Sequence, residues 1–239
     1  GLLLLPPWFA WHYLGSAPRM TFADLWPLLG PVWKAYLLFC WATALGPLPL
    51  WAAQRMLVRL PRELRSNHSQ YHNVARQLGR RPVAGLHPRR LLAGMPGNQI
   101  FDVEFNEKTV EIARLPAALD GLSILHLSDL HMAGTIGKEF YRRVMQLAGD
   151  AEADLVAVTG DLCDRRDCLD WFEDILGGLT ARHGKFFILG NHDLRFGNPD
   201  AVRRAMTELG YVDLGRRWVQ LRIEGTPVVL AGNELPWFL

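Results

Sequence analysis

The sequence of 239 residues contains few cysteines, namely Cys40, Cys163 and Cys168. An odd number of cysteines without a CxxC pair provides neither a disulfide framework nor a zinc ribbon. Reduced thiols of this kind are typical of cytosolic proteins. The chain also lacks any short repeat, and 49% of its residues are hydrophobic. These two features exclude a collagen-like and a disordered chain.

Acidic residues are scarce in the first part of the chain. Residues 1–99 contain only Asp24 and Glu63 against 11 basic residues, which gives this segment a net charge of +9. Residues 100–239 contain 22 acidic and 15 basic residues, a net charge of −7. The overall charge of +2 is the cancellation of these two values. A single uniform globular domain is therefore excluded.

Charged residues are absent from residues 35–54. About 20 apolar residues are needed to cross the hydrocarbon core of a bilayer, so this segment predicts a transmembrane helix. Trp33, Trp41 and Trp51 suit positions at or near the membrane interface. Residues 1–18 are also uncharged and form a candidate for an earlier span. We assign residues 1–60 to a membrane region; the alternative for residues 35–54 is a buried core helix.

A basic stretch follows the predicted span, and we assign residues 61–99 to a basic juxtamembrane linker. Positive charge next to a span favours the cytoplasmic side and attracts anionic lipid headgroups. Nucleic-acid binding is the competing interpretation, but only Tyr71 is interleaved with the charges, so we expect no nucleic acid. The arginines of this stretch are Arg55, Arg59, Arg62, Arg65, Arg76, Arg80, Arg81, Arg89 and Arg90.

From residue 100 the pattern becomes that of a globular α/β domain. Apolar residues at 101, 103, 105, 110 and 112 predict a leading hairpin. Strands are then expected at 123–128, 154–159 and 185–189, followed by helices near 138–149, 168–180 and 199–209. Two short strands near 217–223 and 226–231 come last. Strands that alternate with helices predict a mainly parallel sheet with covered faces.

Three polar clusters follow the three parallel strands. Because the carboxyl ends of parallel strands meet at one edge of the sheet, the clusters are expected to lie together there. Oxygen and imidazole donors suit divalent ions such as Mn, Fe or Zn. Asp161 is central in the order and is expected to bridge two ions, with Asp129 and His131 on one and Asn191 on the other. The clusters are Ser128-Asp129-Leu130-His131, Gly160-Asp161-Leu162-Cys163-Asp164 and Gly190-Asn191-His192-Asp193.

The sequence at these clusters, SDLH, GDLCD and GNHD, resembles the first three motifs of the calcineurin-like metallophosphoesterases. Together with the predicted anchor, it looks like the bacterial membrane-anchored branch of that family. The resemblance implies a four-layered α/β/β/α sandwich over residues 100–239 with a dinuclear metal centre. It also implies that Asp129, His131, Asp161 and Asn191 are metal ligands. His192 would be the catalytic histidine and Asp164 the carboxylate that pairs with it.

The resemblance implies a metal-activated hydroxide that hydrolyses a phosphomonoester, phosphodiester or pyrophosphate, with lipid-linked substrates among the candidates. Arg165 and Asn191 are candidates for substrate binding. We expect a protein of the bacterial inner membrane with a cytoplasmic catalytic domain.

One departure is clear, because relatives carry a later lone histidine and a Gly-His-x-His motif, whereas the last histidine here is His192. We interpret the domain as truncated at its C-terminus. The alternative function is a membrane receptor or transporter-like protein whose phosphoesterase-like part is an inactive regulatory module.

Overall fold

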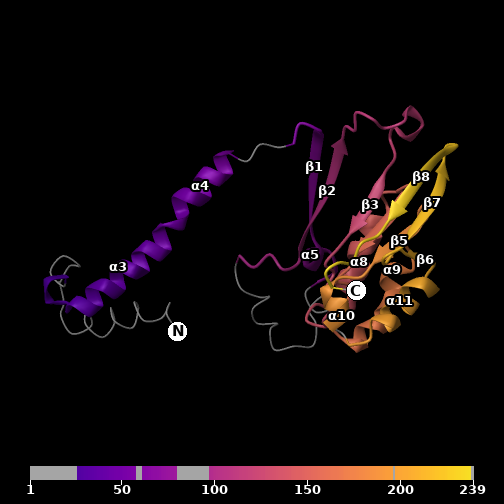
Figure 1. Cartoon of the computed structure of the whole chain (residues 1–239). Helices are drawn as coiled ribbons and strands as arrows, with labels where there is room; N and C mark the ends of the chain where they lie inside the picture. The colour runs from indigo at the N-terminus through magenta and orange to yellow at the C-terminus, as the bar shows by residue number, and fades with distance from the viewer. Residues whose placement is uncertain (1–25, 58–60, 80–96, 196, 238–239) are drawn as a thin grey trace. The chain divides into compact units, whose positions relative to one another are not determined.

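The computed structural model describes residues 26–57, 61–79, 97–195 and 197–237 (Figure 1). The chain divides into two compact units, Gly1–Pro61 and Arg62–Leu239. The second candidate span at 1–18 lies outside the described residues, as do Arg59, Arg80, Arg81, Arg89 and Arg90.

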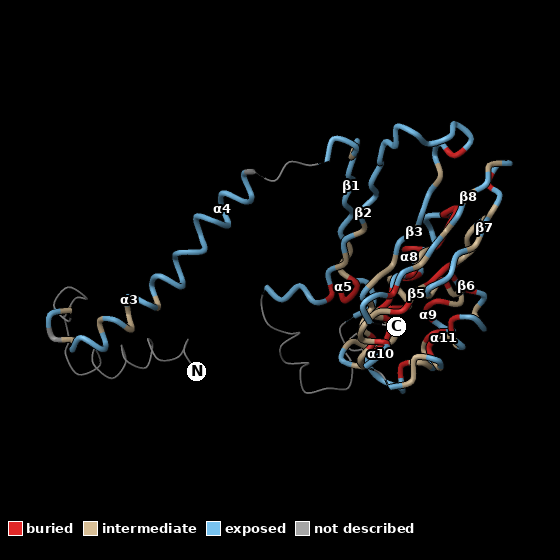
Figure 2. The backbone as a smooth tube through the Cα atoms, viewed as in Figure 1, coloured by how far each residue is buried: buried red, intermediate tan, exposed pale blue. Residues whose placement is uncertain are grey.

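The first unit contains an apolar helix. A short 3-10 turn, η1 (Trp26–Leu28), precedes α3 (Pro31–Leu45), and α4 (Pro47–Leu57) continues it. Gly46 keeps helical backbone angles, and its N–H donates to Ala42 O at 2.8 Å, so the two helices run on without a break. Residues Pro31–Met56 are long and apolar enough to cross a membrane, and none of the apolar window is buried. Figure 2 shows α4 exposed and α3 as a mixture of exposed and intermediate residues, with none buried. Within its own unit the helix is therefore not a buried core helix.

The second unit is built on a parallel sheet of four strands in the order β3-β4-β5-β6. Its strands are β3 (Ile124–Leu127), β4 (Leu155–Thr159), β5 (Lys185–Ile188) and β6 (Tyr211–Asp213). The connections contain α8 (Lys138–Gly149), η3 (Arg166–Trp171), α9 (Phe172–Leu176), α10 (Asn191–Arg195) and α11 (Pro199–Glu208). The predicted α/β class and parallel sheet are confirmed. The structure adds β6 and α10, which the sequence did not predict, and replaces the expected long helix near 168–180 with η3 and α9.

Successive side chains on each strand point to opposite faces of the sheet, and each face has its own hydrophobic core. On β5, Phe187 packs with the helices α8, α9 and α11, whereas its neighbour Phe186 faces the opposite side. That opposite side is covered by the antiparallel hairpin of β7 (Trp218–Ile223) and β8 (Thr226–Ala231), with Ile223 buried against the sheet. A helical layer, a sheet and a second pair of strands thus lie in succession. Among the described residues of this unit, a second outer helical layer does not occur.

The predicted hairpin within residues 101–112 is wrong. Residues Asp102–Val110 form one continuous strand, β2, and its antiparallel partner is β1 (Leu64–Asn73), from the stretch expected to be a linker. Polar pairs across the ribbon hold it, such as Ser69 Oγ to Asn106 Oδ1 at 2.7 Å and Tyr71 OH to Glu104 Oε1 at 3.0 Å. β1 ends at a short helix, α5 (Val74–Leu78), which is capped by the Asn73 side chain. Val74 is buried in the hydrophobic core that also contains residues of α8, α9 and α11. A 3-10 turn, η2 (Ala117–Leu119), then leads toward β3.

Candidate metal centre

The loops after β3 and β4 run side by side beyond the ends of their strands. The N–H of Asp129 donates to Gly160 O at 3.1 Å, that of His131 to Asp161 O at 2.9 Å, and that of Met132 to Leu162 O at 3.0 Å. An isolated parallel bridge between Met132 and Cys163 continues the same pairing. The first two polar clusters are therefore fixed next to each other by main-chain hydrogen bonds.

Three of the predicted metal ligands have left-handed backbone conformations. The φ angles are 56° at Asp129, 43° at His131 and 53° at Asp161. Non-glycine residues adopt this region at an energetic cost, and they hold it where the surroundings overdetermine it. Here the main-chain hydrogen bonds between the two loops supply that constraint. Three of the six non-glycine residues with a positive φ in the described part of the chain are thus predicted metal ligands.

The loops after β4 and β5 touch at two glycines. Gly160 has a φ of +88°, and a Cβ atom there would lie 2.4 Å from Gly190 N. A Cβ atom on Gly190 would lie 2.3 Å from Asp161 Oδ1. Any larger residue at either position would push the two loops apart. The second and third clusters are thus in direct backbone contact.

A carboxylate that the sequence analysis gave no role, Asp193, joins these two loops. Its side chain is fully buried, and Oδ2 accepts the N–H groups of Asp161 at 2.8 Å and Gly190 at 2.9 Å. Oδ1 accepts the N–H groups of Leu162 at 2.9 Å and Cys163 at 3.3 Å. Burial raises the pKa of Asp193, although the four N–H donors act to lower it. In the sequence, the only feature that singles out Asp193 is its place as the last residue of GNHD.

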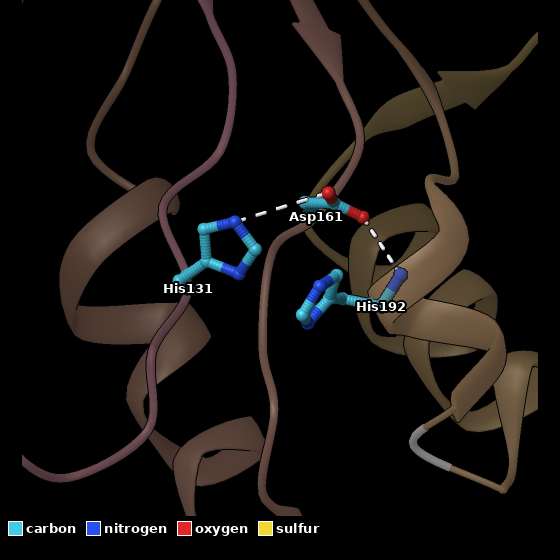
Figure 3. A group of neighbouring side chains, drawn as sticks. All are labelled: His131, Asp161 and His192. Carbon is cyan, nitrogen blue, oxygen red and sulfur yellow. Dashed lines mark hydrogen bonds and ion pairs between the residues drawn. The ribbon is translucent and has the colours of Figure 1, made fainter. Parts of the chain in front are cut away.

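The side chains of His131, Asp161 and His192 converge from these three loops (Figure 3). His131 Nε2 lies 3.8 Å from Asp161 Oδ2 and 3.8 Å from Asp129 Oδ1. Asp161 Oδ1 accepts the main-chain N–H of His192 at 2.8 Å. One ligand atom from each of His131, Asp161 and His192 lies within 4.8 Å of the other two.

These donors fit a divalent cation. Two ligand atoms that share an ion at about 2.1 Å each can lie at most about 4.2 Å apart. His131 Nε2 and Asp161 Oδ2 are 3.8 Å apart, so these two atoms can share one ion as they stand. Imidazole nitrogen together with carboxylate oxygen is the donor set of Mn, Fe and Zn sites. The side chain of Asp161 is 14% exposed and that of Asp129 is 65% exposed, so the group is open to solvent on the Asp129 side.

Asp164 lies between the two histidines. Its Oδ1 is 2.8 Å from His192 Nδ1 and 3.4 Å from His131 Nδ1. The two imidazole rings meet edge to face, with centroids 4.4 Å apart and an interplanar angle of 82°. With Nδ1 engaged by a carboxylate, the Nε2 atom of each ring is left for a ligand or a substrate. The sequence analysis paired Asp164 with His192, and the two side chains are in hydrogen-bonding contact.

The other predicted site residues lie at the margin of this group. Asn191 is half-buried and begins α10, directly between Gly190 and His192. Arg165 forms an ion pair with Asp167 at 2.6 Å, and its side chain is 55% exposed. Cys163 is fully buried, and burial raises the pKa of its thiol to about 12, so it is protonated at neutral pH. Cys163 therefore packs as a small apolar residue.

Comparison with known proteins identifies a family for this part of the chain. Residues 122–234 match the model of the family described as calcineurin-like phosphoesterase. A transmembrane protein with metallophosphoesterase domain from Danio rerio is 32% identical over 96 residues, which are 40% of this chain and 21% of that protein. YkoQ, an uncharacterized metallophosphoesterase from Bacillus subtilis, is 29% identical over 139 residues, 56% of this chain and 50% of that protein.

A third relative is named for its reaction. UDP-2,3-diacylglucosamine pyrophosphatase LpxG from Chlamydia muridarum is 33% identical over 85 residues, 34% of this chain and 26% of that protein. The chain spans between about a fifth and a half of the length of these three relatives. No solved structure matches the chain.

Proposed function

We propose that residues 122–234, which belong to the calcineurin-like phosphoesterase family, carry out metal-dependent hydrolysis of a phosphoester. One observation carries this proposal. Two loops and the helix α10, which follow three successive parallel strands, bring donor atoms of His131, Asp161 and His192 within 4.8 Å of one another. Enzymes on open α/β sheets have their active sites at this carboxyl edge.

Two divalent ions, of Mn, Fe or Zn, would be held by the chain's own donors. Asp129, His131 and Asp161 would bind one, because His131 Nε2 faces both carboxylates at 3.8 Å. Asp161 and Asn191 would contribute to the other, because Asp161 Oδ1 already faces the start of α10. Such ions lower the pKa of a bound water toward neutrality and neutralise charge on phosphate oxygens. Further ligands would come from the whole protein.

His192 would act as the general acid for the leaving group. Asp164 accepts the Nδ1–H of His192 at 2.8 Å, which fixes the orientation of the ring. The Nε2–H of the protonated ring is then available to protonate the departing alkoxide. Asn191 would contribute its amide to the phosphate. Arg165 would have to exchange its ion pair with Asp167 for a phosphate oxygen in order to bind substrate.

A lipid-linked phosphoester is the substrate class that we favour. The apolar helix Pro31–Met56 has the length and composition of a membrane span, and the zebrafish relative is named as a transmembrane protein. LpxG is named for a lipid-linked pyrophosphate substrate. We propose an integral protein of a bacterial inner membrane, with the basic residues after the span and the catalytic domain on the cytoplasmic side. Membrane anchoring would keep the active site close to lipid headgroups.

The test is hydrolysis of bis-p-nitrophenyl phosphate by the whole protein in detergent, with and without added Mn²⁺. We expect metal-stimulated turnover that is removed by EDTA. Asp161→Ala should lower kcat/KM by at least about a hundredfold, because it removes the expected bridging ligand. Asp174→Asn is the matched control, since this exposed carboxylate on α9 pairs with Lys138 away from the site.

Full activity of Asp161→Ala would contradict the proposal. A wild-type protein that binds Mn²⁺ but hydrolyses neither this substrate nor a UDP-diacylglucosamine-type lipid would instead support the alternative of an inactive regulatory module. Comparing the lipid with a soluble nucleotide phosphodiester distinguishes the two substrate classes. A higher kcat/KM for the soluble compound would contradict the lipid assignment alone.

A further inference from the structure

A buried carboxylate outside the three motifs contacts the strand that leads into the third cluster. Glu234 is 2% exposed, and its Oε1 accepts the N–H of Leu189 at 2.7 Å. Leu189 directly precedes Gly190, Asn191 and His192. The hydrogen bond therefore fixes the chain immediately before two residues that we assign to metal binding and proton transfer.

Arg203, on α11, holds Glu234 in this position. Its Nη2 donates to Glu234 Oε2 at 2.6 Å, while Nη1 donates to Asp213 Oδ1 at 2.7 Å at the end of β6. Asp213 Oδ1 also accepts the N–H of Gly215 at 2.8 Å. A Cβ atom on Gly215 would lie 2.5 Å from Arg203 Nη1 and 2.7 Å from Glu234 Oε1, so the loop after β6 closes over the ion pair.

These ion pairs and hydrogen bonds link α11, the end of β6 and Glu234 to one main-chain group, the N–H of Leu189. A hydrogen bond that a carboxylate accepts from a main-chain N–H is charge-assisted, and such bonds are roughly twice as strong as those between neutral groups. A buried ion pair is costly to break by removing one partner, because the other charge is then left uncompensated. Glu234 can therefore neither move nor rotate without cost, and the end of β5 is held equally firmly.

A second carboxylate of similar chemistry lies at the opposite edge of the same sheet. Asp154 Oδ2 accepts the N–H of Ser123 at 2.9 Å, and Oδ1 pairs with Arg182 at 3.2 Å. Both carboxylates thus fix a strand end and pair with an arginine. Only Glu234 lies at the edge that carries the metal-binding loops, which makes Asp154 a control built into the fold.

We propose that Glu234, held by Arg203, is a positioning residue that fixes the Leu189–His192 backbone in the conformation that binds metal. The inference rests on the proposed function, since it gives Glu234 a role in the same site. Glu234 acts through Leu189 and contacts neither metal nor substrate. Partners that orient metal ligands in this way commonly change metal affinity by about 10- to 100-fold when removed.

The test is Glu234→Gln in the whole protein, with Mn²⁺ affinity measured by titration calorimetry and by the electron paramagnetic resonance signal of bound Mn²⁺. A glutamine amide at this position would face two hydrogen-bond donors, Leu189 N–H and Arg203, with only one oxygen that can accept. Its NH₂ group must therefore point at one of the two donors, and that hydrogen bond is lost. We expect Mn²⁺ affinity to fall by at least about tenfold. We also expect kcat/KM for the aryl phosphodiester to fall, because the Leu189–His192 segment carries both Asn191 and His192.

Asp154→Asn is the matched control and should lower the melting temperature while leaving Mn²⁺ affinity unchanged. Arg203→Lys retains one bond to Glu234 and should weaken Mn²⁺ binding less than Glu234→Gln does. If Glu234→Gln fails to fold, Arg203→Lys and Asp213→Asn decide the question, since both leave the carboxylate of Glu234 in place.

Mn²⁺ affinity equal to that of the wild type in the folded variants would overturn the inference. An equal loss of affinity in Asp154→Asn would overturn it as well, because the effect would then be one of general stability. A wild-type protein that binds Mn²⁺ without hydrolysing any phosphoester would contradict the proposed function alone. The Mn²⁺ comparison would still decide the role of Glu234.

Discussion

Gly160 and Gly190 show how strongly single residues constrain this site. Each lacks the Cβ atom that would separate the second and third metal-binding loops, and Gly160 also has a positive φ angle. Donor atoms on different loops can converge only if the backbones that bear them come this close. The glycines thus set the distance between the loops that carry the candidate ligands.

We predict that Gly160→Ala lowers both stability and metal affinity. The left-handed backbone costs a non-glycine residue about 1–2 kcal/mol, and the clash with Gly190 adds to this. Gly225→Ala is the matched control, because Gly225 in the β7–β8 turn has a φ of +76° with open space around it. Thermal unfolding and Mn²⁺ titration provide the readouts. If both variants bind Mn²⁺ equally well, the contact between the loops does not set metal affinity.

The sequence identified the residues with characteristic side-chain patterns and missed those that bind main-chain groups. Asp161 and His192 stand in motifs after predicted strands, so their place at one sheet edge followed from topology. Asp193 and Glu234 accept backbone N–H groups. Such a bond has no partner side chain and leaves no spacing to recognise. Their roles depend on how the loops pack in three dimensions.

At the scale of elements, strands formed by a continuous apolar run were predicted well, and the strands of the polar ribbon were not. The expected ranges for β3, β4 and β5 agree with the structure to within two residues at each end, since each is a run of apolar residues between turns. β1 is a polar segment, LRSNHSQYHN, with no alternating apolar face. Its pairing with β2 depends on cross-strand hydrogen bonds between residues far apart in the sequence. Without knowledge of that partner, the apolar residues of β2 suggested a hairpin.

The carboxylate at the amino ends of β3 and β4 gives a pH-dependent prediction. Hydrogen bonds from the main chain and hydroxyl of Ser123, together with Arg182, hold the pKa of Asp154 below its ordinary value of 3.8. A lowered pKa means that the carboxylate stabilises the fold above pH 3.8, and that this contribution is lost as pH falls through the folded-state pKa. Asp154→Asn should therefore be less stable than wild type near neutral pH, with the difference shrinking toward pH 3.

Urea unfolding midpoints in EDTA between pH 3 and pH 7 measure this effect. A constant difference between the two proteins over that range would contradict it. EDTA keeps the metal-binding carboxylates free of metal in both proteins, so their titration cancels in the comparison.

At the scale of the whole molecule, charge and hydropathy divide the chain into two parts. The structure has an apolar helix with exposed side chains in the first unit and an α/β fold in the second. This division was visible in the sequence because a membrane span and a soluble domain differ in composition. Within the second unit, the parallel strands, the helices α8 and α11 and the strands β7 and β8 were predicted, whereas the pairing of β1 with β2 was not.

We predict that the helix Pro31–Met56 anchors the protein as a span. After cell fractionation the protein should stay in the membrane pellet through washes with 1 M NaCl and alkaline carbonate, and should dissolve in detergent. Electrostatic attachment through the arginines would be released by the salt wash, because high ionic strength screens charges. Release by salt alone would exclude the span.

A paired substitution locates the span more closely. Leu45→Lys places a charge near the middle of the helix, where insertion costs about 2.5–3.5 kcal/mol. Val32→Lys, near the first residue of the helix, is the control, because a lysine there can extend to the interface. We expect Leu45→Lys to reduce the membrane-bound fraction and Val32→Lys to leave it unchanged.

The contact between Glu234 and Leu189 has a consequence for the order of events during synthesis. The ribosome releases the loops of the three polar clusters before it releases Glu234, so a nascent chain possesses every candidate ligand while the end of β5 still lacks its hydrogen bond. Metal captured at that moment would meet a looser site than the finished domain offers. Maturation of the site is thus tied to the emergence of a residue that touches no metal.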